Sequence, residues 1–252
     1  MNVVFLGSGN VATHLSQAMQ QAGMTILQVY SPTAEHAREL ADKLNCPWTT
    51  DVNAILPADL YIFCLKDVAL PGFLRTFPPH AGLWVHTAGS MPLTVFEGYT
   101  KRYGTLYPLQ TFSKGRDVYF NNIPLFIESN NPEDEILLLS IAESLSGRVQ
   151  LLSSEKRRYL HLAAVFACNF TNHMYALASE ILEANGIDRK ALLPLIDETA
   201  AKIHSLTPAE AQTGPAVRYD ENVIAKHLEM LDDPLLKEIY QSVSNSIHKH
   251  TT

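Results

Sequence analysis

The sequence of 252 residues predicts an α/β fold in which a doubly wound, mostly parallel sheet is followed by an all-helical domain. Up to about residue 152, short apolar runs without alternation are separated by helical patterns, as expected for parallel strands buried on both faces. From residue 153 onward the strand pattern disappears and helical patterns remain. We therefore expect two domains, residues 1–152 and residues 153–252.

The N-terminal segment predicts a strand, a turn, a helix and a second strand. Asn2–Leu6 is a continuous apolar run, and the helical pattern after it lasts to Gly23, a typical C-terminal stop. Ile26–Tyr30 is the second apolar run, and the segment AEHARELADKL after Ser31-Pro32-Thr33 predicts another helix. The βαβ unit thus closes within about 30 residues, the usual size.

The rest of the chain predicts further strands and then helices. Strands are expected at Trp48–Thr49, Leu60–Leu65, Leu83–His86, Tyr103–Leu106, Ile123–Ile127 and Arg148–Leu152, with a helix from about Pro132 to Leu145. The C-terminal helices are expected at about Ser154–Ala184 with a left-handed cap at Asn185-Gly186, at Asp188–Ser205 interrupted near Pro194, at Asn222–Leu231, and after Asp233-Pro234.

Composition excludes several classes of protein. With 26 acidic and 19 basic residues the formal charge is −7, which argues against nucleic acid or anionic lipid as the main partner. Cys46, Cys64 and Cys168 lack C-x-x-C spacing, so no disulfide framework or metal site is predicted. The apolar start ends at Gly7 without a basic region, and later apolar runs fall short of the ~18 residues of a membrane span. We expect a cytoplasmic protein that does not enter the membrane.

The pattern Gly7-x-Gly9-x-x-Ala12 follows a strand and opens a helix, which is the context of a dinucleotide-binding turn in a Rossmann-like domain. Gly7 permits the sharp turn, Gly9 leaves room for a pyrophosphate, and Ala12 lets the helix lie close to the sheet. Free N–H groups at the helix start then bind the anion, although a tight turn without a ligand is the alternative. The predicted cofactor-binding residues are Gly7, Ser8, Gly9, Asn10, Val11, Ala12, Ser31, Thr33 and Leu65.

The end of the second strand favours NADP over NAD. An acidic residue at this position binds the ribose hydroxyls of NAD. Here the sequence is Tyr30-Ser31-Pro32-Thr33, which has no carboxylate to repel a 2′-phosphate and has two hydroxyls that can donate to it.

Candidate catalytic residues follow the fifth predicted strand. His86 lies at the carboxyl end of that strand and could donate to a substrate carbonyl or carboxylate. Ser90 could do the same as the N-cap of a short helix, and the alternative is a capping turn with a structural imidazole. The segment Tyr107–Thr111 is expected to be an irregular polar and aromatic loop that could close over a cofactor.

The first predicted C-terminal helix carries His161, Val165, Asn169 and His173 at intervals of four residues, within one stripe of its surface. Buried polar groups need partners or a cavity, so His161 and Asn169 could project into an interdomain cleft and orient a substrate. A hydrogen bond between helices is the alternative. Farther on, Arg218 could pair with an anionic substrate, but a surface arginine is the more plausible interpretation. Asp220 is expected to be an N-cap. His248 and His250 are expected to lie in a frayed terminus.

In the segments described above, the sequence resembles the β-hydroxyacid-dehydrogenase-type reductases and pyrroline-5-carboxylate reductase. More closely, the chain is similar to a family of uncharacterised NADP oxidoreductases that join a Rossmann-like domain to a helical domain of unknown function. The segments that carry this similarity are the phosphate turn, His86-Thr-Ala-Gly89-Ser90, Tyr107–Phe112, His161–Asn169 and Thr213-Gly214-Pro215. The resemblance implies two domains, a nucleotide cofactor and a dimer, which we expect to form through the C-terminal helices.

One position departs from the related dehydrogenases, which carry a Lys-x-x-x-Asn pair on the corresponding helix. If Asn169 is that asparagine, Val165 stands at the lysine position, and His161 is the nearby titratable replacement. We therefore predict an NADP-dependent oxidoreductase that transfers a hydride between the nicotinamide and a small carbonyl or imine substrate in an interdomain cleft. The alternative is a catalytically inactive dinucleotide-binding sensor or scaffold protein. The sequence does not name the substrate.

Overall fold

A computed structural model describes residues 1–251 of the chain. The chain divides into two compact units, Met1–Asn169 and Phe170–Thr252. The first long C-terminal helix begins just after residue 152, where the sequence pattern changes, and its first turns belong to the first unit. Each unit is described by itself.

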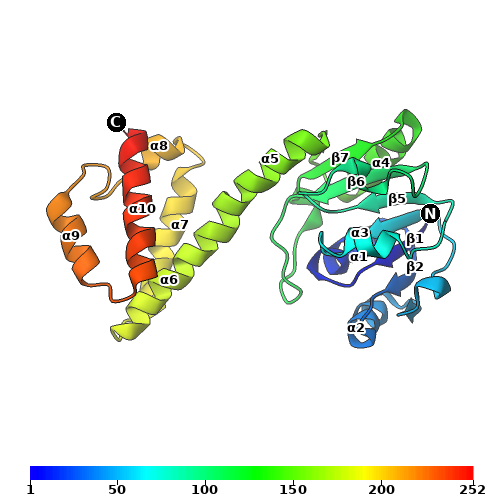
Figure 1. The fold of residues 1–252 in the computed structure, drawn as a ribbon, viewed down its shortest axis with the longest axis horizontal. Helices are drawn as coiled ribbons and strands as arrows, with labels where there is room; N and C mark the ends of the chain where they lie inside the picture. Colours follow the sequence, from blue (N-terminus) through cyan, green and yellow to red (C-terminus); the bar gives the residue numbers. More distant parts are fainter. Residues whose placement is uncertain (252) are drawn as a thin grey trace. The chain divides into compact units, whose positions relative to one another are not determined.

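The first unit contains an eight-stranded sheet with the order β3-β2-β1-β4-β5-β6-β7-β8 (Figure 1). The strands are β1 (Asn2–Leu6), β2 (Thr25–Tyr30), β3 (Trp48–Thr49), β4 (Leu60–Phe63), β5 (Leu83–His86), β6 (Tyr103–Pro108), β7 (Leu125–Ser129) and β8 (Val149–Leu151). All neighbours are parallel except β6 and β7. The sheet grows in both directions from β1, which confirms the doubly wound, Rossmann-like fold.

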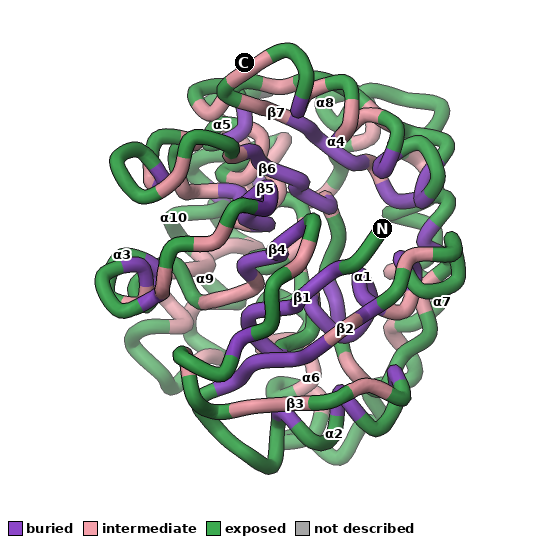
Figure 2. The backbone as a smooth tube through the Cα atoms, turned by 90° about the vertical axis from the view of Figure 1, so that its right-hand side faces the viewer, coloured by how far each residue is buried: buried purple, intermediate pink, exposed green. Residues whose placement is uncertain are grey.

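Helices cover the sheet and bury both faces of its central strands. They are α1 (Asn10–Gln21), α2 (Ala34–Leu44), α3 (Leu70–Leu74) and α4 (Pro132–Leu145). The next helix, α5 (Ser154–Ala164), follows β8, and Arg157 is its one buried residue. In β1, Val3 and Phe5 belong to one apolar cluster and Val4 and Leu6 to another. Figure 2 shows these central strands as buried along most of their length. Burial on both faces explains why the strand sequences are apolar without alternation.

After α5 the helix continues through a π-helical segment, Val165–Phe170. The second unit then contains α6 (Thr171–Ala184), α7 (Leu193–Lys202), α8 (Pro208–Ala211), α9 (Glu221–Glu229) and α10 (Pro234–Thr251). Within residues 1–251, no helix combines the length and the apolar character that crossing a bilayer requires.

Local sequence signals account for most of the helix ends in the second unit. Gly186 has the left-handed φ of 71° that was predicted after α6. Asp220 caps α9 by accepting a hydrogen bond from Val223 N–H. The expectation of a frayed C-terminus was wrong, since α10 extends to Thr251 and the ring of His248 stacks on Tyr219 at 4.3 Å.

Candidate functional site

The turn between β1 and α1 has the geometry of a phosphate-binding turn. Gly7 has a φ of 116°, its N–H donates to the Tyr30 carbonyl, and a Cβ there would lie 2.4 Å from the carbonyl oxygen of Cys64. A Cβ on Gly9, the N-cap of α1, would meet nothing within 4 Å. Ala12 is fully buried and lets α1 lie against the sheet. The turn is therefore packed tightly against Cys64 at Gly7 and has free space at Gly9.

The start of α1 offers donors to an anion. Helix geometry leaves the N–H groups of Asn10, Val11 and Ala12 without partners within the helix, and no side chain caps this end. The Asn10 side chain points elsewhere, since its Nδ2 donates to the Phe112 carbonyl at 2.8 Å. That bond ties the loop after β6 to the turn. The donors and the open space at Gly9 fit a dinucleotide pyrophosphate.

The other predicted cofactor-binding residues lie around this turn. Ser8 and Ser31 are buried, and the Ser31 hydroxyl accepts a hydrogen bond from Thr33 N–H at 3.4 Å. Thr33 is exposed at the start of α2, and Leu65 follows β4 and is partly buried. Because β1, β2 and β4 are parallel, their carboxyl ends lie at the same edge of the sheet, as a doubly wound ligand site requires.

A cluster of polar side chains lies near this edge, at the end of β6. The Tyr107 hydroxyl is 3.0 Å from Nδ1 of His161 on α5. The backbone of Gly89 lies against both, since a Cβ there would be 2.6 Å from His161 Nδ1 and 2.9 Å from Tyr107 Cζ. Thus three sequence motifs, around residues 86–90, 107–112 and 161–169, meet here. The predicted loop at Tyr107–Thr111 is corrected in part, because Tyr107 and Pro108 end the strand.

A cavity of about 530 Å³ opens beside the Tyr107–His161 pair. From β6 and the loop after it, the cavity is lined by Tyr107, Leu109, Gln110 and Thr111. From α5 and the π-helical segment it is lined by Leu160, His161, Ala163, Ala164, Ala167, Cys168 and Asn169. Both predicted catalytic residues of this helix, His161 and Asn169, therefore face one cavity.

Arg157, one helical turn before His161, was not predicted from the sequence. It is fully buried, its Nη1 donates to Glu128 Oε2 at 2.7 Å, and its Nη2 donates to the Met91 carbonyl at 2.6 Å. Burial raises the pKa of the Tyr107 phenol, and the nearby Arg157 charge opposes that rise. The i, i+4 spacing of Arg157 and His161 is the signal that could have found it.

His86 lies inside the protein. Its side chain is fully buried, Ala88 N–H donates to Nδ1 at 3.2 Å, and Nε2 is 3.1 Å from the Thr105 hydroxyl. Since Nδ1 accepts, the proton is on Nε2, which donates to Thr105. The pKa of His86 is lowered to about 3, mainly by burial and to a smaller extent by the Arg157 charge, so the ring is neutral. This geometry corresponds to the structural imidazole that was the alternative prediction.

Ser90 does not cap a helix as expected. The short 3₁₀ helix after it is Leu93–Phe96, and its N-cap is Pro92. The Ser90 hydroxyl instead donates to the Asp67 carboxylate, from the loop after β4. Neither His86 nor Ser90 lines the cavity beside Tyr107, and their catalytic roles remain predictions.

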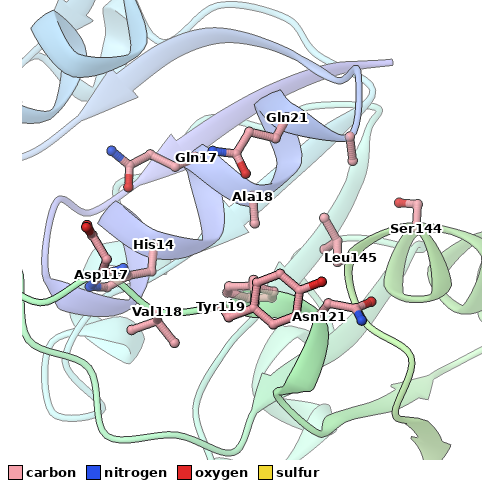
Figure 3. Close-up of a pocket in the computed structure, with 12 residues that line it drawn as sticks. His14, Gln17, Ala18, Gln21, Asp117, Val118, Tyr119, Asn121, Ser144 and Leu145 are labelled. Carbon is pink, nitrogen blue, oxygen red and sulfur yellow. The ribbon is translucent and has the colours of Figure 1, made fainter.

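A second cavity of about 460 Å³ lies against α1 (Figure 3). Gln17 and Gln21 of α1 face it, together with Asp117 and Asn121 from the segment before β7. No residue predicted to be catalytic or cofactor-binding lines this cavity. Among the residues that the structure describes, there is also no group of three or more His, Cys, Asp or Glu suited to a metal ion.

Comparison with known families matches both parts of the chain. Residues 2–85 match the family described as "NADP oxidoreductase coenzyme F420-dependent", and residues 123–247 match a domain of unknown function, DUF2520. No curated protein matches the chain.

Solved structures give similarity over the whole length. A Bacteroides fragilis protein described as a "putative NADP oxidoreductase" has 52% sequence identity and a TM-score of 0.93, over 98% of both chains. A Myxococcus stipitatus imine reductase, solved with NADP⁺, has 16% identity and a TM-score of 0.66 over 99% of this chain and 92% of that one. Streptococcus pyogenes 1-pyrroline-5-carboxylate reductase has 14% identity and a TM-score of 0.63 over 100% and 98%. The last two show similarity of fold alone.

Proposed function

Since the chain belongs to the same family of NADP oxidoreductases as the Bacteroides fragilis protein, we propose that it reduces a small carbonyl or imine substrate with NADPH. The substrate binds in the cavity lined by Tyr107, His161 and Asn169. The observation that carries this proposal is the Tyr107 hydroxyl, 3.0 Å from His161 Nδ1, at the wall of that cavity.

The cofactor site and the substrate cavity are connected through this chain's own residues. The N–H groups at the start of α1 bind the pyrophosphate, and bound NADP supplies hydride transfer at its nicotinamide. Phe112 is held to Asn10 by the 2.8 Å hydrogen bond, and the loop that precedes Phe112 lines the cavity at Leu109, Gln110 and Thr111. The two sites thus share one loop, which supports a substrate position near the cofactor.

Tyr107 and His161 provide the proton that a reduction needs. In the reducing direction the substrate carbon gains a hydride, and its oxygen or nitrogen gains a proton from the Tyr107 hydroxyl. His161, protonated on Nδ1, donates to the phenol oxygen and replaces that proton. As it does so, Nε2 of the partly exposed His161 ring takes a proton from solvent, so the ring never carries a negative charge. The Arg157 charge stabilises the phenolate that forms briefly.

Asn169 orients the substrate in this proposal. Its side-chain amide lies in the same cavity and can donate to the substrate oxygen or nitrogen while the alanines of the helix contact the substrate carbons.

The test is NADPH oxidation, followed by its absorbance, with a panel of small ketones, aldehydes and cyclic imines. Tyr107→Phe removes the proton donor and keeps the ring, so we expect kcat to fall by about 10²–10⁴ while NADPH binding is unchanged. Tyr119→Phe is the matched control, because Tyr119 is exposed and does not line the cavity. A Tyr107→Phe enzyme with the kcat of the original protein would refute the assignment.

A second candidate function is a dinucleotide-binding sensor without catalysis. Val165 favours it, because the related dehydrogenases carry a lysine at the presumed equivalent position. Tight NADPH binding with no turnover on any member of the panel would support the sensor over the reductase.

We also propose that the protein is a homodimer formed through its C-terminal helices. No residue of α6, α7 or α9 is buried within the chain, and large apolar side chains such as Leu193, Leu195 and Met230 are 54%, 63% and 78% exposed. A second copy would cover these exposed apolar side chains. A monomeric mass at micromolar concentration by light scattering would contradict the proposal.

A cytoplasmic location is consistent with the cysteines. Cys46, Cys64 and Cys168 are all free, and burial raises the pKa of Cys46 to about 11 and that of Cys64 to about 12. Such thiols are unreactive and suit a reducing compartment. Fractionation of the native cells tests this.

A further inference from the structure

Among residues 1–251, no acidic side chain, lysine or arginine lines the cavity beside the Tyr107–His161 pair. We propose that its substrate is an uncharged, largely apolar ketone, aldehyde or imine that carries no carboxylate or phosphate group. This inference rests on the proposed reductase function and specifies its substrate class.

The chemistry of the cavity wall separates into two parts. One wall is apolar, from Leu109 and Leu160 to the alanines at 163, 164 and 167. The polar groups are the Tyr107 hydroxyl, the His161 ring and the amide of Asn169, with Gln110 and Thr111 at the loop. Apolar walls with a few placed polar groups are typical of sites that orient one polar atom of an otherwise apolar ligand.

A substrate carboxylate would find hydrogen-bond donors here but no lysine or arginine to pair with. Proteins usually bind carboxylate and phosphate groups with arginine or lysine, and moving an anion from water into a site without such a partner is costly. Arg157 does not fill this role, because it is fully buried and does not line the cavity, and its Nη1 and Nη2 are bound by Glu128 and by the Met91 carbonyl. The anion-binding donors of the chain are instead those of the phosphate turn, which the cofactor uses.

The cavity also has room for an apolar substituent. Its volume of about 530 Å³ lies within the usual range of small-molecule sites. Three alanines, at 163, 164 and 167, lie among the helical residues of the wall, so several substrate carbons can lie against them.

A matched pair of ketones tests the inference on the full-length protein with NADP⁺ bound. 3-Methylcyclopentanone and 3-oxocyclopentanecarboxylate have the same ring and a substituent of similar size, and they differ in charge. Titration calorimetry should show that the neutral ketone binds at least tenfold more tightly, a ratio that corresponds to about 1.4 kcal/mol. Equal or tighter binding of the carboxylate overturns the inference, whether or not either compound is reduced.

Turnover of the same pair with NADPH separates this inference from the proposed function. Reduction of the carboxylate with the higher kcat/KM leaves the reductase function intact and overturns the substrate class. Tighter binding of the neutral ketone with no reduction of either compound supports the substrate class and counts against the reductase function.

A designed reversal gives an independent check. Ala167 lines the cavity and is exposed, so Ala167→Arg adds a cation there without disturbing a packed core. We expect this variant to bind the carboxylate at least tenfold more tightly than the original protein does. Ala184→Arg is the control, since Ala184 is exposed at the end of α6 and does not line this cavity. An unchanged preference in Ala167→Arg, with NADPH binding retained, overturns the assignment of this cavity to the substrate.

Discussion

The two glycines of the phosphate turn should respond to the same substitution in opposite ways. Gly7→Ala places a Cβ 2.4 Å from the Cys64 carbonyl oxygen, at a residue whose φ is 116°. Gly9→Ala places a Cβ in open space, at a residue whose φ of −76° is ordinary for alanine. We therefore expect Gly7→Ala to lower stability, and Gly9→Ala to weaken cofactor binding with little effect on stability.

The magnitudes follow from the local geometry. For Gly7→Ala the backbone conformation alone costs about 1–3 kcal/mol, and displacement of the Cys64 carbonyl adds to it, so about 3 kcal/mol is expected. For Gly9→Ala the weaker N-cap costs about 0.5–1 kcal/mol, and the lower entropy of the unfolded chain returns about 0.4–1 kcal/mol. These contributions nearly cancel. The Cβ of Gly9→Ala takes the space that the pyrophosphate needs and moves it away from the N–H groups of the turn. Loss of one charge-assisted hydrogen bond in this way costs about 2 kcal/mol, or roughly 30-fold in the Kd for NADPH.

Urea unfolding measures the first effect, and calorimetric titration with NADPH measures the second. Each variant is the control for the other, because both replace glycine by alanine two residues apart. NADPH affinity equal to that of the original protein in Gly9→Ala would refute the phosphate turn. Unchanged stability in Gly7→Ala would refute the close contact with Cys64.

Two further predictions concern charged groups away from the phosphate turn. Arg157→Met leaves the Glu128 carboxylate without its charged partner, with the Ser154 hydroxyl still donating to it, so the free energy of unfolding should fall by about 3 kcal/mol. A fall below about 1 kcal/mol in urea unfolding would contradict the importance of this ion pair. For Asp134, burial alone would raise the pKa of its carboxyl, but hydrogen bonds from Arg102 and Asn131 outweigh it and lower the pKa below 3.8. Because the folded-state pKa is the lower one, this stability is present above the unfolded-state pKa and lost as pH falls through the folded-state value. In Arg102→Ala the free energy of unfolding should therefore fall less steeply as the pH is lowered. If it falls as steeply as in the original protein, the Arg102–Asp134 pair is not the cause.

Local signals predicted the N-terminal half of the chain well. The turn could be predicted because few residues other than glycine adopt the backbone conformation of Gly7, and only a residue without a side chain leaves the space found at Gly9. The helix Pro132–Leu145 matches its prediction because its N-cap, Asn131, and the proline after it are both sequence signals. Buried parallel strands were recognisable because both of their faces are covered. In each case the information lies within a few neighbouring residues.

The roles of His86 and Ser90 depended on contacts between distant segments. His86 ends a strand as predicted, but the Thr105 hydroxyl of β6 and the N–H of Ala88 take both of its ring nitrogens. Ser90 pairs with Asp67, which is 23 residues earlier in the chain. The sequence places a residue at a strand end, and it does not say which neighbour its side chain contacts. Arg157 was missed for the same reason, since its partner Glu128 is on β7.

The π-helical segment changes the significance of Val165. In a regular α-helix, residues 161, 165 and 169 would lie in one stripe, and a lysine at 165 would face the same side as His161 and Asn169. From Val165 to Phe170 the helix is π-helical, with hydrogen bonds that span five residues, so the spacing of four no longer marks one face. Ala164, Ala167, Cys168 and Asn169 line the cavity, and Val165 does not. Position 165 therefore need not correspond to the lysine position of the related dehydrogenases, and this weakens the support that Val165 gives to the sensor. In the proposed reductase the proton comes from groups that line the cavity, and the contact between Tyr107 and His161 supports this pair as its source.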